Sequence, residues 1–108
     1  MKPVIVAVLH PLPGSDAGPL TRATADARAV CAERHVRGFL AAGATSAMIV
    51  TGPPDERTFG ARLRELAATS AGGGLVVLGS GAIPLASAAD RRAFVEAAAA
   101  GQPRALAN

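Results

Sequence analysis

Three short apolar runs, separated by segments with helical periodicity, constrain the fold of this chain more than any other feature of its sequence. The runs are Val4–Leu9, Ala47–Thr51 and Leu75–Leu78, and β-branched residues are frequent in them. Continuous apolar runs of this length are typical of strands that are covered on both faces, as in parallel sheets. Each run therefore predicts a buried strand.

The segments between and after these runs predict helices over about Thr21–Ala42, Glu56–Thr69 and Ala88–Ala100. In the first helix, Gly43 is well placed as the C-terminal stop. In the third, Ser87 and Asp90 have the spacing of a capping box, and Gly101 stops the helix. The residues expected on the apolar stripes, at a spacing of about 3.6 residues, are Ala25, Ala29, Ala32, Val36, Phe39, Leu40 and Gly43, then Phe59, Leu63, Leu66 and Ala67, then Phe94 and Val95.

This order of elements is β-α-β-α-β-α, which predicts a three-layer, Rossmann-like α/β fold with a small parallel sheet in a single domain, residues 1–108. If the strands lie in sequential order, all the helices cover one face of the sheet and the other face exposes valines and isoleucines. Such a face needs covering. We expect either a homo-oligomer or, preferably, a following segment that makes residues 1–108 the amino-terminal half of a longer domain.

Composition excludes several classes of function. The net charge is +3, but the ten arginines are spread over three helices without a basic run or interleaved aromatics, so we expect no nucleic-acid partner. The single cysteine, Cys31, excludes an internal disulfide and a cysteine-rich metal site. No apolar run approaches the roughly 20 residues of a membrane span, so we expect a cytoplasmic protein with no membrane partner.

Glycine-rich segments follow the first and third predicted strands, at the sheet edge where α/β proteins bind ligands. Gly79-Ser80-Gly81 follows the third strand, and a proline-rich loop, His10–Leu20, follows the first. In one interpretation the two segments bind a phosphate group through backbone amides and Arg22, and Thr21 caps the helix. In the other, His10–Leu20 is an ordinary surface loop. The candidate nucleotide- or phosphate-binding residues are Gly14, Ser15, Gly18, Thr21, Arg22, Gly79, Ser80 and Gly81.

Candidates for metal binding or nucleophilic catalysis are few. Asp16 is the candidate ligand for Mg²⁺, whereas Asp55 and Asp90 are better explained as helix starters. Cys31 and His35 lie four residues apart on one helix face and could form half of a zinc site or an activated thiol. Without a second such pair, two ordinary, partly buried residues are the preferred interpretation. A nucleophile elbow and a Walker loop are both absent from the sequence.

The segment Gly81-Ala82-Ile83-Pro84-Leu85-Ala86-Ser87 resembles the Gly-Asp-x-Pro-Leu-x-Ser motif of nucleotidyltransferases with the glycosyltransferase-A-type fold. These include molybdenum-cofactor and phospholactate guanylyltransferases. Residues 36–52, a helix ending in Ala-Gly before a strand, are also similar to the family. The resemblance covers the first half of such a domain, and Gly14–Arg22 matches the family's Gly-x-Gly-x-Arg loop loosely. Ala82 stands where the family has its metal-binding aspartate.

Two functions of different classes follow. The resemblance implies a nucleotide-binding domain, part of a larger nucleotide-diphospho-sugar-transferase-like domain, that uses Mg²⁺ and transfers a nucleoside monophosphate from a triphosphate to a phosphorylated small molecule. The alternative is a non-catalytic α/β module that binds a small anionic ligand or assembles through its sheet. Ala82 favours the alternative, because a methyl group cannot bind Mg²⁺.

Overall fold

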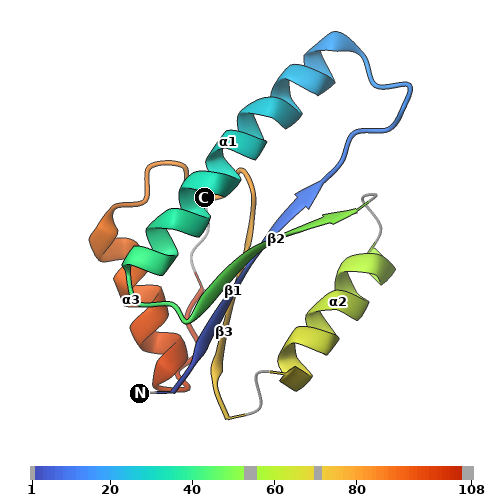
Figure 1. The fold of residues 1–108 in the computed structure, drawn as a ribbon. Helices are drawn as coiled ribbons and strands as arrows, with labels where there is room; N and C mark the ends of the chain where they lie inside the picture. Colours follow the sequence, from blue (N-terminus) through green and yellow to red (C-terminus); the bar gives the residue numbers. More distant parts are fainter. Residues whose placement is uncertain (1, 53–55, 70–71, 106–108) are drawn as a thin grey trace.

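In the part of the chain that the structure describes, three strands and three helices alternate, as the sequence predicts (Figure 1). The computed structural model describes residues 2–52, 56–69 and 72–105. Its elements are β1 (Val4–Pro11), α1 (Pro19–Ala41), β2 (Ser46–Gly52), α2 (Glu56–Thr69), β3 (Gly74–Gly79) and α3 (Ala88–Ala99). The β-α-β-α-β-α order and the α/β fold class are therefore confirmed.

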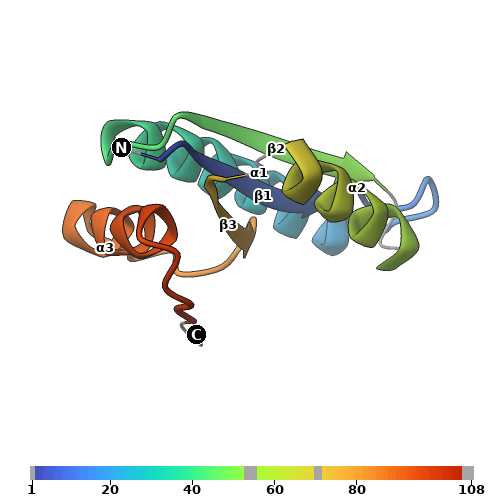
Figure 2. The ribbon, with the colours of Figure 1, turned by 90° about the horizontal axis from the view of Figure 1, so that it is seen from below.

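The sheet is parallel, with β1 in the centre and the order β2-β1-β3. The chain thus crosses the sheet in one direction from β1 to β2 and in the opposite direction from β2 to β3. Because crossovers share one handedness, their helices must lie on opposite faces. Figures 1 and 2 show α1 and α3 on one side of the sheet and α2 on the other. The layers are therefore helix, sheet and helix, and the sequential strand order does not occur.

The core lies between the sheet and the layer of α1 and α3. Val4, Val6 and Val8 alternate along β1 and point to this side, as the period of two in a strand requires. They pack with Phe39 of α1 and Val95 of α3. The core is aliphatic and alanine-rich, like the composition, and it includes the fully buried ring of Phe39, at 0% exposure.

The opposite face of the sheet is covered unevenly. α2 packs against β2, and on β3 the side chain of Val77 remains 43% exposed. Val77 pairs with Ala7 of β1, on the face away from the core. The open apolar face that the sequence predicts is thus confined, among the described residues, to the part of the sheet at β3.

Local signals set most of the helix ends correctly. Ser87 and Asp90 form the expected capping box, and hydrogen bonds from Ser87 hold the pKa of the Asp90 carboxyl below its usual range. Gly43 follows the end of α1 with φ +108°, a conformation that favours glycine. In the described parts of the chain, no helix combines the length and the hydropathy needed to cross a membrane.

Three local predictions need correction. α1 begins at Pro19 with Gly18 as its N-cap, so Thr21 is the third helical residue and does not cap the helix. Proline at a first helical position is favourable because its missing N–H has no partner there in any case. β1 continues to Pro11, so His10 is in a strand, not in a loop. Leu40 is exposed on α1 and lies outside the core stripe.

Candidate functional site

The carboxyl ends of β1 and β3 are tied together by a buried side-chain pair. His10 Nδ1 and Ser80 Oγ share a hydrogen bond of 3.0 Å, and the Ser80 N–H donates to the Leu9 carbonyl at 2.8 Å. Ser80 is only 2% exposed. Its hydroxyl therefore points into the protein, toward His10, and its contribution at this edge is to hold β3 and the turn after it against β1.

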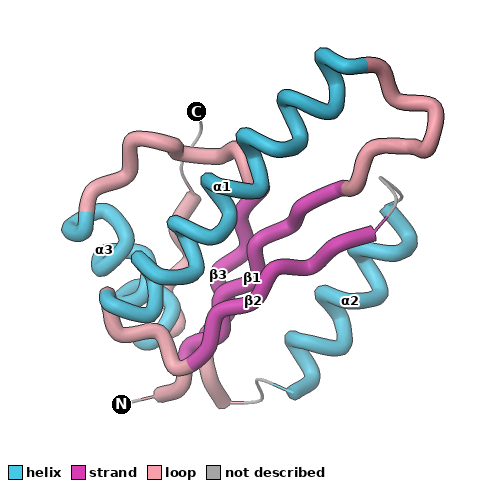
Figure 3. The backbone as a smooth tube through the Cα atoms, turned by 45° about the horizontal axis from the view of Figure 1, so that its top comes forward, coloured by secondary structure: helices cyan, strands magenta, loops and turns pink. Residues whose placement is uncertain are grey.

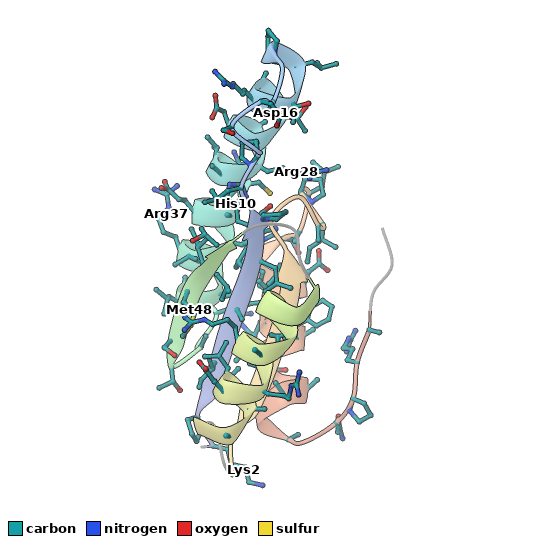
Figure 4. The ribbon with its side chains drawn as sticks, turned by 90° about the vertical axis from the view of Figure 1, so that its right-hand side faces the viewer. Lys2, His10, Asp16, Arg28, Arg37 and Met48 are labelled. Carbon is teal, nitrogen blue, oxygen red and sulfur yellow. The ribbon has the colours of Figure 1, made fainter. Side chains whose placement is uncertain are left out.

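The candidate residues of the first loop lie on an exposed segment at the outer end of α1. The Ala17 N–H donates to the Gly14 carbonyl at 3.0 Å and forms a turn, and Arg22 Nη2 donates to the Ser15 carbonyl at 3.4 Å. Figure 4 shows Asp16 at the tip of this loop, well beyond His10. Arg22 thus contacts its own loop, and its guanidinium is exposed.

The structure does not bring this loop tip and the Gly79–Gly81 turn together as closely as the sequence analysis expects. Figure 3 shows α1 extending past the end of the sheet, so the loop at its outer end lies beyond the strand ends. The Gly79–Gly81 turn lies beside Arg28 instead. A Cβ at Gly81 would be 3.3 Å from Arg28 Nε, whereas a Cβ at Gly79 would meet no atom within 4 Å. Arg28 follows Arg22 by six residues, or about 9 Å along the helix axis.

Arg28 also lines a groove between α1 and the start of the first loop. This groove, called the α1 groove below, has a volume of about 420 Å³ and is lined by Pro11, Leu12, Pro13, Leu20, Thr21, Thr24, Ala25 and Arg28. Figure 4 shows Arg28 at the level of His10, near the end of β1. The α1 groove therefore includes the first turn of α1, and Arg28, which lines it, also lies beside Gly81.

Sequence reasoning included Thr21 in the candidate site but missed Arg28 and His10. The missed signal is helical spacing: Thr21, Thr24 and Arg28 follow each other at three and four residues, which places them on one helix face. His10 carries no such local signal, because its partner Ser80 is 70 residues away in the sequence. Only the sheet order makes the two neighbours.

The loop after β3 is held onto α1 by a second buried histidine. His35 is 1% exposed, and its Nε2–H donates to the Ala82 carbonyl at 2.7 Å. The next residue, Ile83, has φ +37°, which is strained for a β-branched side chain. The surrounding contacts therefore keep this loop in a conformation that its local sequence disfavours.

Buried Arg91 packs beside the same part of α1. Its guanidinium carbon lies 6.0 Å from the centre of the Phe39 ring, and a Cβ at Gly38 would come within 2.7 Å of it. Burial lowers the pKa of His35, and the positive charges of Arg91 and Arg34 lower it further, against an opposing effect of the hydrogen bond to Ala82. The folded protein thus favours the neutral form of the His35 imidazole over the protonated form.

We expect the free energy of unfolding to fall as the pH is lowered through the range below 6.5. The unfolded chain takes up a proton at His35 near its ordinary pKa of about 6.5. The folded chain resists protonation because its pKa is lower, so protons favour the unfolded state until the folded pKa is passed. Urea unfolding at pH 7.5 and pH 5.5 measures the effect. The variant His35→Gln should lose part of the pH dependence, and an unchanged slope would contradict the assignment to His35.

Potential metal ligands do not cluster in the described part of the chain. Within the described ranges, no three His, Cys, Asp or Glu side chains lie close enough to hold a metal. Asp16 is exposed at the loop tip, and Asp55 lies outside the described residues. His35 uses Nε2 for the Ala82 carbonyl, and Cys31 is a half-buried free thiol.

Comparison with known proteins gave no relatives. No family model matches the chain, and neither a curated protein nor a solved structure is similar to it.

Proposed function

We propose that this chain binds a nucleotide, or a related small phosphorylated molecule, in the α1 groove. The observation that carries the proposal is the position of Arg28, which lines the α1 groove and lies against Gly81. Arginine is well suited to phosphate because its planar guanidinium donates two parallel hydrogen bonds. A phosphate at this junction would contact Arg28 and the backbone of the Gly79–Gly81 turn together.

Other features of the α1 groove favour an anion. The groove begins at the first turn of α1, where free backbone N–H groups and the helix dipole attract negative charge. The side-chain N-cap that often occupies such N–H groups is missing, because Gly18 is the N-cap residue. The apolar wall formed by Pro11, Leu12, Pro13 and Leu20 offers a surface for a base or another flat apolar group.

The resemblance to nucleotidyltransferases makes a nucleoside triphosphate the preferred ligand class. In that interpretation the chain contributes the nucleotide-binding part of a domain that transfers a nucleoside monophosphate to a phosphorylated acceptor. The proposal for this chain is binding without transfer, since Ala82 replaces the motif aspartate and no group of three potential metal ligands occurs among the described residues. A small anionic ligand other than a nucleotide is the alternative within the same site.

Thermal unfolding of the chain with GTP, CTP, ATP or tripolyphosphate, each with and without Mg²⁺, tests the proposal. A ligand at about 100 times its dissociation constant adds about 2.7 kcal/mol to the stability of the folded state, so the expected result is a rise in Tm of several degrees. A rise with tripolyphosphate alone would identify phosphate recognition, and a larger rise with one nucleotide would identify the base. Indifference of Tm to every compound would contradict the proposal.

We expect Arg28→Ala to abolish the ligand-induced rise in Tm. The substitution removes the only guanidinium among the residues that line the α1 groove. Arg34→Ala is the matched control, because Arg34 is also exposed on α1 and does not line the groove. Its rise in Tm should equal that of the unmodified chain. Equal rises in all three proteins would show that any binding occurs elsewhere.

A further inference from the structure

A second groove follows the outer edge of β3, on the far side of this strand from β1. Two adjoining cavities of about 340 and 250 Å³ share Val76, Val77, Phe94 and Arg104 among their lining residues. Their walls come from β3, from α3 and the segment 102–105 that follows it, and from Phe39, Ala82 and Ile83. Figure 2 shows this last segment leaving α3 on the β3 side of the sheet. We call the two cavities together the β3 groove.

The lining residues indicate that the β3 groove lies between β3 and α3 and extends to the outer edge of the strand. Leu75, Val76, Val77, Leu78 and Gly79 are consecutive, and all of them line it. Successive residues of a strand point to opposite faces of the sheet. Because residues of both orientations line the groove, it reaches the outer edge of β3, which also presents backbone N–H and C=O groups.

This edge of β3 has no partner strand in the described part of the chain. β3 is at the end of the strand order, and it pairs with β1. Proteins commonly protect a free edge with a lysine, a proline or a bulge. The sequence of β3, Gly-Leu-Val-Val-Leu-Gly, contains no charged residue and no proline. Its edge is thus suited to pairing with another strand.

The charge at the β3 groove indicates the chemistry of the partner. Arg104 lies over the Phe94 ring, with its guanidinium carbon 5.9 Å from the ring centre. The acid that it influences, Asp90, is already engaged by the Ser87 N–H in the capping box. A carboxylate on an incoming strand would complement Arg104. A second copy of this chain would instead bring its own Arg104 to the same place, so like charges oppose self-pairing.

We propose that the β3 groove binds an extended peptide segment of a partner protein, which pairs with β3 as a fourth strand. The segment carries apolar side chains, which pack on Val77 and Phe94, and a carboxylate that meets Arg104. The backbone hydrogen bonds along the edge supply affinity, and the side-chain pockets supply selectivity, as in other cases of strand addition. This site uses none of the residues that line the α1 groove.

The probe is the peptide Thr-Val-Thr-Val-Thr-Val-Glu-amide with a fluorescent label on its N-terminus. It is titrated with the full chain, and binding is followed by fluorescence anisotropy. We expect saturable binding at one peptide per chain. A peptide with proline in place of the central valine should bind at least about tenfold more weakly, because proline lacks the N–H and disfavours a paired strand. Absence of saturable binding, or equal binding of the proline peptide, would overturn the proposal.

Two protein variants locate the binding. Val77→Lys places a charge on the exposed edge and should weaken binding at least about tenfold, while Val30→Lys, at a 60% exposed valine on α1, should leave it unchanged. Arg104→Gln should weaken binding of the probe peptide by about two- to fivefold, as expected for an exposed ion pair. It should not change the binding of the same peptide with glutamine in place of its glutamate. Thermal melts confirm that each variant folds. Unchanged binding by Val77→Lys would contradict the site.

Sedimentation of the chain without peptide tests the other possible occupant of the β3 edge, which is a second copy of this chain. We expect a monomer. A concentration-dependent dimer that Val77→Lys dissociates and Val30→Lys preserves would show that a second copy occupies the edge, and it would overturn the proposal of a partner peptide.

Discussion

We expect Phe39→Ala to lower the free energy of unfolding by about 3–5 kcal/mol, the range for removing a fully buried phenylalanine. Phe39 is 0% exposed and belongs to the core that joins α1 to β1, β3 and α3. Its ring also lies 6.0 Å from the His35 ring and under the Arg91 guanidinium. Truncation would leave a cavity and would remove the aromatic face on which the buried cation rests. A loss of this size is a large fraction of the 5–15 kcal/mol that stabilises a typical domain.

Equilibrium unfolding in urea measures this loss. Leu85→Ala is a suitable control, because Leu85 is exposed after β3 and substitutions at such positions change stability by about 0.5 kcal/mol or less. Phe39→Leu should lie between the unmodified chain and Phe39→Ala, since it keeps most of the apolar volume. A loss below about 1 kcal/mol for Phe39→Ala would show that the core is not packed around this ring.

Gly74→Ala is expected to destabilise the fold by about 1–3 kcal/mol or more, the range for overpacking in a tightly packed region. The Cβ of an alanine at position 74 would overlap with the Ala98 carbonyl group in α3. This neighbour is backbone, so it cannot move aside without moving the end of α3. Gly74 also donates its N–H to the Pro3 carbonyl at 2.8 Å. The glycine at this position therefore allows a close approach of β3 and α3.

The matched control is Gly79→Ala, at the other end of the same strand. A Cβ at Gly79 would meet no atom within 4 Å, and its φ is not in the left-handed region. Alanine there should change the free energy of unfolding by about 0.5 kcal/mol or less. Urea unfolding of the two variants tests the contrast, and equal losses at Gly74 and Gly79 would contradict the close packing of α3 on β3.

The two proposed sites can be separated by experiment, because Arg28 lines the α1 groove and not the β3 groove, whereas Val77 lines the β3 groove and not the α1 groove. Arg28→Ala should remove the nucleotide-induced rise in Tm without changing peptide binding, and Val77→Lys should do the reverse. Arg28 lies at the carboxyl edge of the sheet, beside the Gly79–Gly81 turn. Val77 lies on the outer edge of β3. Failure of one proposal would therefore leave the other standing.

Part of the candidate site followed from local sequence patterns, and the rest depended on contacts between distant residues. Glycine segments after the first and third strands indicated which sheet edge to inspect, and Thr21 indeed lines the α1 groove. The expected phosphate ligand Arg22 instead contacts Ser15 in its own loop. Arg28 takes the place beside the Gly79–Gly81 turn because α1 is long and extends past the sheet. Sequence spacing alone does not show which turn of α1 the Gly79–Gly81 turn will contact.

The sequence by itself determined the secondary structure and its alternation. Apolar runs, helical periodicity, Gly43 and the Ser87–Asp90 capping box act through neighbours a few residues away, so they can be interpreted without knowing the fold. Tertiary structure alone decided the strand order β2-β1-β3, the opposite placement of α2, and the pairing of His10 with Ser80 and of His35 with Ala82. The physical reason is that these contacts join segments 47 and 70 residues apart, and such contacts depend on how the helices cover the two faces of the sheet.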